Sequence, residues 1–250
     1  MSRFGLPVSA LIALMLIVAG CGGSTPPAEE QATPAAPAES VADHMADHFS
    51  HIRDIEQAVI RGDLEAAQAP AQWMVEHQTL SNLPADSAVY LAEIRNSASG
   101  VAATDDIGNA AVATATMVAA CGKCHTATGV TPPMPDVPQP AGAEGITDHM
   151  KQHMQAVDLM YEGLAAPSDD LWKKGAGLLK ASPLEGESLP QELSDDVKAA
   201  EARVHEMADR ATNAADTGAK IAIYGELIGG CASCHGLHGK VWGPGVPKVE

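Results

Sequence analysis

The sequence predicts an all-helical protein made of two fused four-helix bundles, each ending in a Cys-x-x-Cys-His motif. Three observations support this fold class. First, 46% of the 250 residues are hydrophobic but only 3% are aromatic, and an alanine-rich chain with few β-branched residues favours helices over sheets. Second, apolar residues recur at spacings of three and four, as in amphipathic helices. Third, the chain contains an internal duplication.

The first 20 residues are predicted to be a lipoprotein signal peptide. Arg3 gives this segment its positive charge, and Leu11–Val18 is an apolar run of the kind found in secretory signals. The run ends in Val-Ala-Gly followed by Cys21, which resembles a bacterial lipobox with Cys21 as the lipidated residue. An ordinary signal peptide is the alternative. We therefore expect an exported protein, anchored by lipid to a bacterial membrane and facing the periplasm or the cell exterior.

The rest of the chain is divided by segments rich in proline, alanine and glycine, which are typical of linkers. The predicted parts are a tether at 21–40, a first helical domain at 41–131, a linker at 132–145, a second helical domain at 146–243, and a tail at 244–250. Each domain contains one Cys-x-x-Cys-His motif near its end.

The two predicted domains repeat the same landmarks in the same order. Asp43–Phe49 reads DHMADHF and Asp148–Met154 reads DHMKQHM, which places the paired histidines 105 residues apart (44 to 149). A Leu-Pro pair follows in each domain at an offset of 106 residues (83 to 189). The Cys-x-x-Cys-His motifs at 121–125 and 231–235 lie 110 residues apart. Such a small drift indicates a duplication with changes in loop length.

Each domain is expected to contain four helices. In the first domain, apolar spacing predicts a helix over Val41–Arg61, which ends at Gly62, and a capping residue at Asp63 predicts a second helix that continues to Glu76. The remaining predicted helices are Pro84–Gly100, then 105 or 106 into the motif, and in the second domain Asp148–Gly163, Asp170–Ala181, Pro190–Asn213 and Asp216–Cys234. Four amphipathic helices joined by short loops form an antiparallel bundle by default.

The two motifs carry the chemistry. On a helix, positions i, i+3 and i+4 share a face, so both cysteines and the histidine of each motif converge. This spacing is the attachment signal for c-type haem, in which two thioethers hold the porphyrin and the histidine binds iron. The predicted haem-binding residues are Cys121, Cys124, His125, Cys231, Cys234 and His235, with the two histidines as iron ligands. A zinc site, a redox pair of thiols and structural disulfides are the alternatives.

With these motifs at the carboxyl end of four predicted helices, the chain resembles the class II cytochromes c, the group that includes cytochrome c prime. The resemblance covers nearly all of residues 41–240 as two copies, although each copy is shorter than a typical member. It implies two covalently bound haem groups. It also implies that the first helix of each domain faces the distal side of the haem, opposite the histidine of the motif.

The sixth iron ligand is open at this stage. The apolar stripe of the second domain, Ile146, Met150, His153, Val157, Met160 and Leu164, places a methionine and a histidine on the inner face. Met45 and His48 match them in the first domain. We favour His48 and His153, because a buried imidazole needs a bond, with Met45 and Met150 as the alternative and an open position as the third possibility. His44 and His149 are expected at a solvated helix edge.

The net charge of the chain limits the classes of partner that it can bind. The chain carries a net charge of −17, which argues against binding nucleic acid, since phosphate contacts need a basic surface. The same charge would steer a redox partner with a basic docking patch. The sequence therefore predicts a membrane-tethered dihaem electron carrier rather than an enzyme. A dihaem peroxidase-like enzyme and a gas-binding or sensing cytochrome are the alternatives, and both require an open iron position.

Overall fold

The computed structural model describes residues 40–77, 79–133, 136, 145–181 and 195–238. These residues belong to one compact unit of the chain, Glu39–Glu250. They form eight α-helices and one 3-10 turn, and no strand occurs among them. The all-helical prediction is therefore confirmed. The predictions for the signal peptide, Cys21 and most of the tether and linker lie outside the described residues, as does the tail.

The first four helices follow the predicted ranges closely. They are α1 (Val41–Ile60), α2 (Leu64–Glu76), α3 (Ala88–Ala103) and α4 (Ile107–Thr128), with the 3-10 turn η1 (Ala85–Ser87) before α3. Side-chain caps explain three of the starts: the oxygens of Ser40, Asp63 and Asp106 accept hydrogen bonds from Asp43, Ala66 and Asn109 N–H at 3.1, 3.0 and 2.7 Å.

The second four helices repeat this order. They are α5 (Gly145–Ala165), α6 (Asp169–Lys180), α7 (Asp195–Thr212) and α8 (Thr217–His238). Ser168 caps α6 by accepting a hydrogen bond from Leu171 N–H at 3.3 Å, and Asp216 caps α8 through Ala219 N–H at 2.8 Å. The last helix continues past Cys234, where the sequence prediction ended, so the whole second motif is helical.

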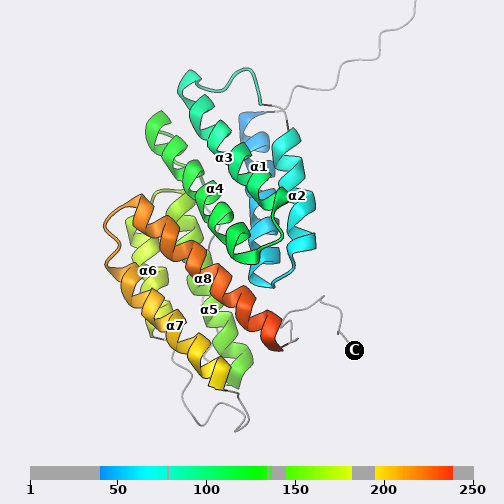
Figure 1. The fold of residues 1–250 in the computed structure, drawn as a ribbon. Coiled ribbons are helices and arrows are strands. Elements are labelled where there is room, and N and C mark those ends of the chain that lie inside the picture. The colour runs from blue at the N-terminus through cyan, green and yellow to red at the C-terminus, as the bar shows by residue number, and fades with distance from the viewer. Residues whose placement is uncertain (1–39, 78, 134–135, 137–144, 182–194, 239–250) are drawn as a thin grey trace, which may run out of the picture. The chain divides into compact units, whose positions relative to one another are not determined.

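Within each group of four, neighbours in sequence also pack in space. Contacts join α1 to α2, α2 to α3 and α3 to α4, and α1 also contacts α4. The same holds for α5 to α8, in which α5 also contacts α8. Figure 1 shows that α1 begins and α4 ends toward one end of the described unit, while α5 begins and α8 ends toward the other. We call α1–α4 the first helix set and α5–α8 the second helix set.

The two helix sets pack against each other mainly through α4 and α8. Small residues allow this close approach: a Cβ at Gly225 would lie 3.1 Å from Val112 Cα, and one at Gly229 would lie 3.4 Å from Ala111 Cβ. The hydrophobic core is continuous across this contact, and it includes Tyr161 and Tyr224, which are 1% and 0% exposed. Both sets therefore share one interior.

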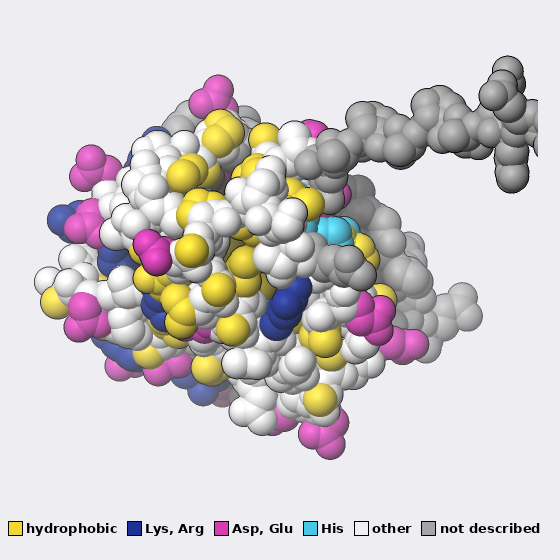
Figure 2. Space-filling model, turned by 90° about the horizontal axis from the view of Figure 1, so that it is seen from above, with side chains coloured by type: hydrophobic (Ala, Val, Ile, Leu, Met, Phe, Trp, Pro, Cys, Tyr) yellow, Lys and Arg dark blue, Asp and Glu magenta, His cyan; other side chains and the backbone are white. Residues whose placement is uncertain are grey.

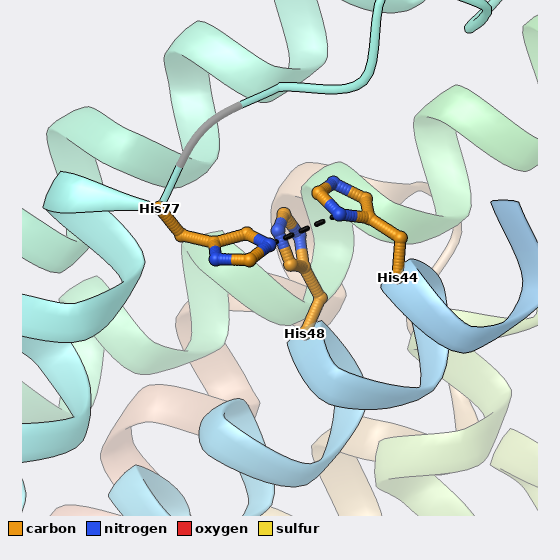
Figure 3. Close-up of side chains that lie close together, drawn as sticks. All are labelled: His44, His48 and His77. Atoms are coloured by element: carbon orange, nitrogen blue, oxygen red, sulfur yellow. Dashed lines mark hydrogen bonds between the residues drawn. The ribbon is translucent and has the colours of Figure 1, made fainter. Parts of the chain in front are cut away.

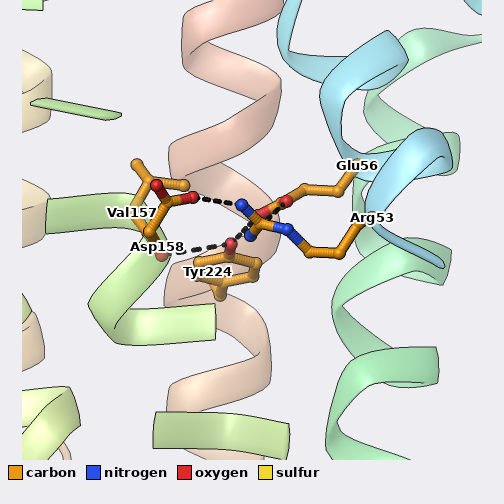
Figure 4. A network of polar contacts seen from close by, with 5 residues as sticks. All are labelled: Arg53, Glu56, Val157, Asp158 and Tyr224. Carbon is orange, nitrogen blue, oxygen red and sulfur yellow. Dashed lines mark hydrogen bonds and ion pairs between the residues drawn. The ribbon is translucent and has the colours of Figure 1, made fainter. Parts of the chain in front are cut away.

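A buried polar network joins α1, α5 and α8 within this interior (Figure 4). Arg53 of α1 forms ion pairs with Asp158 of α5 and, at 2.8 Å, with Glu56 of its own helix. Tyr224 of α8 donates a hydrogen bond to Glu56. Burial raises the pKa of Glu56 to about 7, and Arg53 only partly opposes this effect. The network thus holds a carboxyl group with no exposure to solvent.

None of the described helices combines the length and the apolar character that a bilayer span requires.

Candidate haem and metal sites

The first motif lies in the last turns of α4. Because this helix continues to Thr128, the side chains of Cys121, Cys124 and His125 share one face. Both thiols are free. Burial raises the pKa of Cys121 to about 12, and Cys124 beside it adds to the effect. Burial thus favours the protonated thiol form of Cys121.

The second motif occupies the same place in α8. Cys231 and Cys234 are also free thiols, and burial raises the pKa of Cys231 to about 12. Burial also raises the pKa of Cys234, and the carboxylate of Glu201 on α7 raises it further. The motif on α8 and Glu201 on α7 are therefore close enough to interact electrostatically.

Both motif histidines are held through one ring nitrogen. Nδ1 of His125 lies 2.9 Å from the carbonyl oxygen of Ala165, and Nδ1 of His235 lies 2.8 Å from that of Ile60. A carbonyl oxygen can only accept, so Nδ1 must carry the proton in each bond. The neutral ring then has its lone pair on Nε2, which is the arrangement found in metal-binding histidines.

A cluster of three histidines lies where α1 begins and α2 ends (Figure 3). We call His44, His48 and His77 the first His cluster; one ring nitrogen from each lies within 4.8 Å of the others. His77 Nε2 and His44 Nδ1 share a hydrogen bond of 3.0 Å. The rings of His77 and Trp73 stack with centroids 4.0 Å apart. The three imidazoles are therefore packed against one another, and His77 also stacks on Trp73.

His48 has surroundings that disfavour a protonated ring. Burial lowers its pKa to about 3, and His44 and His77 lower it further by charge repulsion. Its Nε2 atom is buried and has no hydrogen-bond partner in the described part of the chain. A neutral imidazole can bind a metal ion through a ring nitrogen that carries no proton, so His48 in this position is suited to be a metal ligand.

The second helix set has a cluster at the matching place. We call His149, His153 and Glu201 the second His cluster; their ligand atoms lie within 4.8 Å of one another. Glu201 pairs with His149 at 3.2 Å, with His153 at 3.8 Å and with His205 at 3.0 Å. Although burial works against the charge, the bond from His149 and the charges of His153 and His149 lower the pKa of Glu201. This cluster thus carries a carboxylate that the first one lacks.

The structure corrects one sequence-based expectation. His44 and His149 were expected at a solvated helix edge, but they are only 0% and 6% exposed. The expectation was wrong because other elements cover this edge: the end of α2 brings His77 against His44, and α7 brings Glu201 against His149. Met45 and Met150, the alternative ligands, are half-buried.

The third members of the clusters were missed from the sequence. His77 follows the end of α2 and Glu201 lies on α7, and neither position belongs to the duplicated pattern. Four of the histidines on α1 and α5 did carry a signal, because His44 and His48, like His149 and His153, are four residues apart and share a helix face. Such a pair is itself a common arrangement for metal ligands.

These groups limit what each site can bind. Imidazole nitrogens suit zinc, copper, nickel and iron, and two imidazoles with a carboxylate suit zinc or iron. An iron held in haem takes only one protein ligand on each side. Each helix set therefore offers thiols and one anchored imidazole on its last helix and further imidazoles on its first.

No family model, curated protein or solved structure matches this chain.

Proposed function

We propose that the protein is a dihaem c-type cytochrome that carries electrons, with each helix set acting as a four-helix haem domain. The observation that carries this proposal is the repeated Cys-x-x-Cys-His motif, helical in both copies, at the end of α4 and of α8. Haem bound at these motifs would supply a one-electron couple between two oxidation states of iron. The chain itself supplies ligands, burial and a docking surface.

The residues at the motifs suit this group. Free thiols at i and i+3 on one helix face have the spacing from which two thioethers to haem form. His125 and His235 each keep Nε2 for iron, because Nδ1 is bonded to a carbonyl. We assign both as the proximal ligands.

The distal ligands in this proposal are His48 and His153. Support comes from their burial at 9% and 7% exposure and from the buried Nε2 of His48. Support also comes from direction, since α1 begins and α4 ends toward the same end of the first helix set, as α5 begins and α8 ends toward the same end of the second (Figure 1). Two imidazole ligands would give a six-coordinate, low-spin iron with a lower potential than histidine and methionine together.

The proposed setting is a bacterial membrane surface. Lipid on Cys21 would tether the protein, and its negative charge would attract a redox partner with a basic patch. Seen from the end where α1 begins, hydrophobic side chains are scattered over the face among Lys or Arg side chains, and most acidic side chains lie toward the rim (Figure 2).

Haem content tests the proposal directly. Purified protein should keep two covalent haem groups after denaturation, as measured by intact mass and by the pyridine haemochrome spectrum. Cys124→Ser should reduce this to one haem by removing the first site, and Cys234→Ser should do the same at the second. Lys123→Ala, which changes a variable position of the first motif, is the matched control and should keep both. Wild-type protein with zinc or with no covalent haem would overturn the proposal.

The tether is tested separately. Mature protein should begin with a lipid-modified Cys21 and partition with membranes, and Cys21→Ser should abolish lipid modification. A soluble product that begins beyond Cys21 would contradict the anchor but leave the haem assignment intact.

A further inference from the structure

We propose that the two helix sets complete each other's proximal iron sites: Ala165 of the second set holds His125, and Ile60 of the first set holds His235. This inference rests on the proposed haem function, since it concerns the ligands assigned to iron. It adds that neither motif has its complete surroundings within its own repeat. The two haem centres would then form one structural unit.

The contacts are reciprocal. Ala165 is the last residue of α5 and accepts a hydrogen bond from His125 of α4 at 2.9 Å. Ile60 is the last residue of α1 and accepts one from His235 of α8 at 2.8 Å. Ile60 and Ala165 are 105 residues apart, the offset that separates Arg53 from Asp158. The two bonds are therefore the same contact, made once in each direction by equivalent positions.

The acceptors are suited to this role. The last carbonyl groups of a helix have no partner within the helix and carry its partial negative charge. A donor from another helix therefore meets a strong acceptor at Ile60 and at Ala165.

The helices approach closely at both contacts. A Cβ at Gly122, inside the first motif, would overlap the carbonyl oxygen of Leu164, next to Ala165. In the second motif the matching residue is Ala232, and its carbonyl oxygen would lie 3.2 Å from a Cβ at Gly62. Gly62 has φ of 73°, a conformation that favours glycine. Small residues thus allow each motif to reach the end of the other set's first helix.

The hydrogen bond at Nδ1 affects each histidine as a ligand for iron. A hydrogen bond from Nδ1–H fixes the ring orientation and tautomer, and it increases the basicity of Nε2. The potential of each haem would therefore depend on a carbonyl of the other repeat. Moving the end of α5 should alter the first centre and leave the second unchanged.

The contact itself can be measured without a variant. In reduced or haem-free protein labelled with 15N and 13C, NMR should detect a through-hydrogen-bond coupling between Nδ1 of His125 and the carbonyl carbon of Ala165. A matching coupling should join His235 and Ile60. Absence of both couplings in folded protein would overturn the inference. Because this measurement does not need haem, it separates failure of the contact from failure of the proposed function.

A pair of variants tests the consequence. Gly122→Ala should weaken the His125 coupling and shift one of the two reduction potentials, with the other unchanged. Alanine occupies the matching position 232, so the change is compatible with a working motif. Gly236→Ala follows His235 directly and meets no atom within 4 Å, and as the control it should shift neither potential. Unchanged potentials in Gly122→Ala, or a shift of both, would overturn the inference; if this variant does not fold, the wild-type couplings decide.

Discussion

Helices α1 and α5 occupy equivalent places in the two helix sets, and two of the differences between the sets bear on the candidate sites. At an offset of 105 residues, His44 and His48 correspond to His149 and His153, so the paired imidazoles are kept. Arg53 corresponds to Asp158, and these two residues form an ion pair with each other. Equivalent positions thus carry opposite charges where the two helix sets meet. The comparison teaches that the histidine-bearing ends of the two helices are alike, whereas the residues at the contact between the sets are complementary.

The second difference is in the third member of each cluster. His77 completes the first His cluster with a third imidazole, whereas Glu201 completes the second with a carboxylate. In the proposed dihaem protein, a carboxylate near iron would stabilise the more positive oxidised state. The two proposed centres should therefore differ in potential, with the second one lower, and electrons would pass from the second centre to the first.

The largest expected effect comes from removing a distal ligand. His48→Ala should convert the first iron from low-spin to high-spin and let it bind carbon monoxide when reduced, while the second iron stays low-spin; His153→Ala should do the reverse. The visible spectrum of each variant, with and without carbon monoxide, provides the measurement. Met45→Ala and Met150→Ala are the controls. Loss of the low-spin spectrum in these variants instead would move the assignment to methionine.

Glu201→Gln tests the proposed inequality of the centres. Removing the negative charge should raise the potential of the second haem by roughly 60 mV, which corresponds to about 1.4 kcal/mol for one electron. Spectroscopic redox titration measures both centres at once. Glu206→Gln, an exposed residue of the same helix, should leave both potentials as they are. An unchanged gap between the centres in Glu201→Gln would remove the basis for a preferred direction.

The third prediction concerns pH, and it uses Glu56, whose equivalent in α5 is Tyr161. Burial raises the pKa of Glu56 from 4.5 to about 7. Between these values the folded state keeps a proton that the unfolded state has lost, so the free energy of unfolding should fall as pH rises through this window. The total loss is on the order of 3 kcal/mol.

Urea unfolding at pH 5 and pH 7.5 measures this change. The slope of the wild type also contains His48, whose lowered pKa acts in the opposite sense, and Glu162, whose pKa is raised like that of Glu56. The difference between the wild type and Glu56→Gln isolates Glu56, and stability should fall more steeply with pH in the wild type. Asp54→Asn, an exposed neighbour on α1, should keep the wild-type slope. Equal slopes in the wild type and in Glu56→Gln would contradict the prediction.

The smallest effect is expected at the ion pair. Asp158→Asn should lower the free energy of unfolding by about 1 kcal/mol, since both partners of the pair with Arg53 are only partly buried, at 25% and 26% exposure. Asp47→Asn, exposed on α1, should change it by less. Equal effects of the two substitutions would mean that the complementary charges contribute nothing to the contact between the helix sets.

The sequence predicted the helices better than it predicted the sites. Spacing and capping residues located eight helices to within a few residues, because these signals are local. His77 and Glu201 could not be predicted as cluster members, since their positions depend on how α2 and α7 pack against other helices. The acceptors Ile60 and Ala165 could not be predicted either. Every residue has a backbone carbonyl, so the sequence does not indicate which of them accepts a hydrogen bond from a distant histidine.

The reciprocal packing of the helix sets bears on how such a chain could arise. A protein with a single repeat could satisfy the same contacts by pairing with a second copy of itself, because both directions of the contact use equivalent positions. In that homodimer, however, position 53 would face its own copy, and two arginines would repel each other. When the two repeats are joined in one chain, the contact is always made between one copy of each repeat. The two facing residues can then differ from each other. The pair of Arg53 and Asp158 is thus a feature that only the fused protein could acquire.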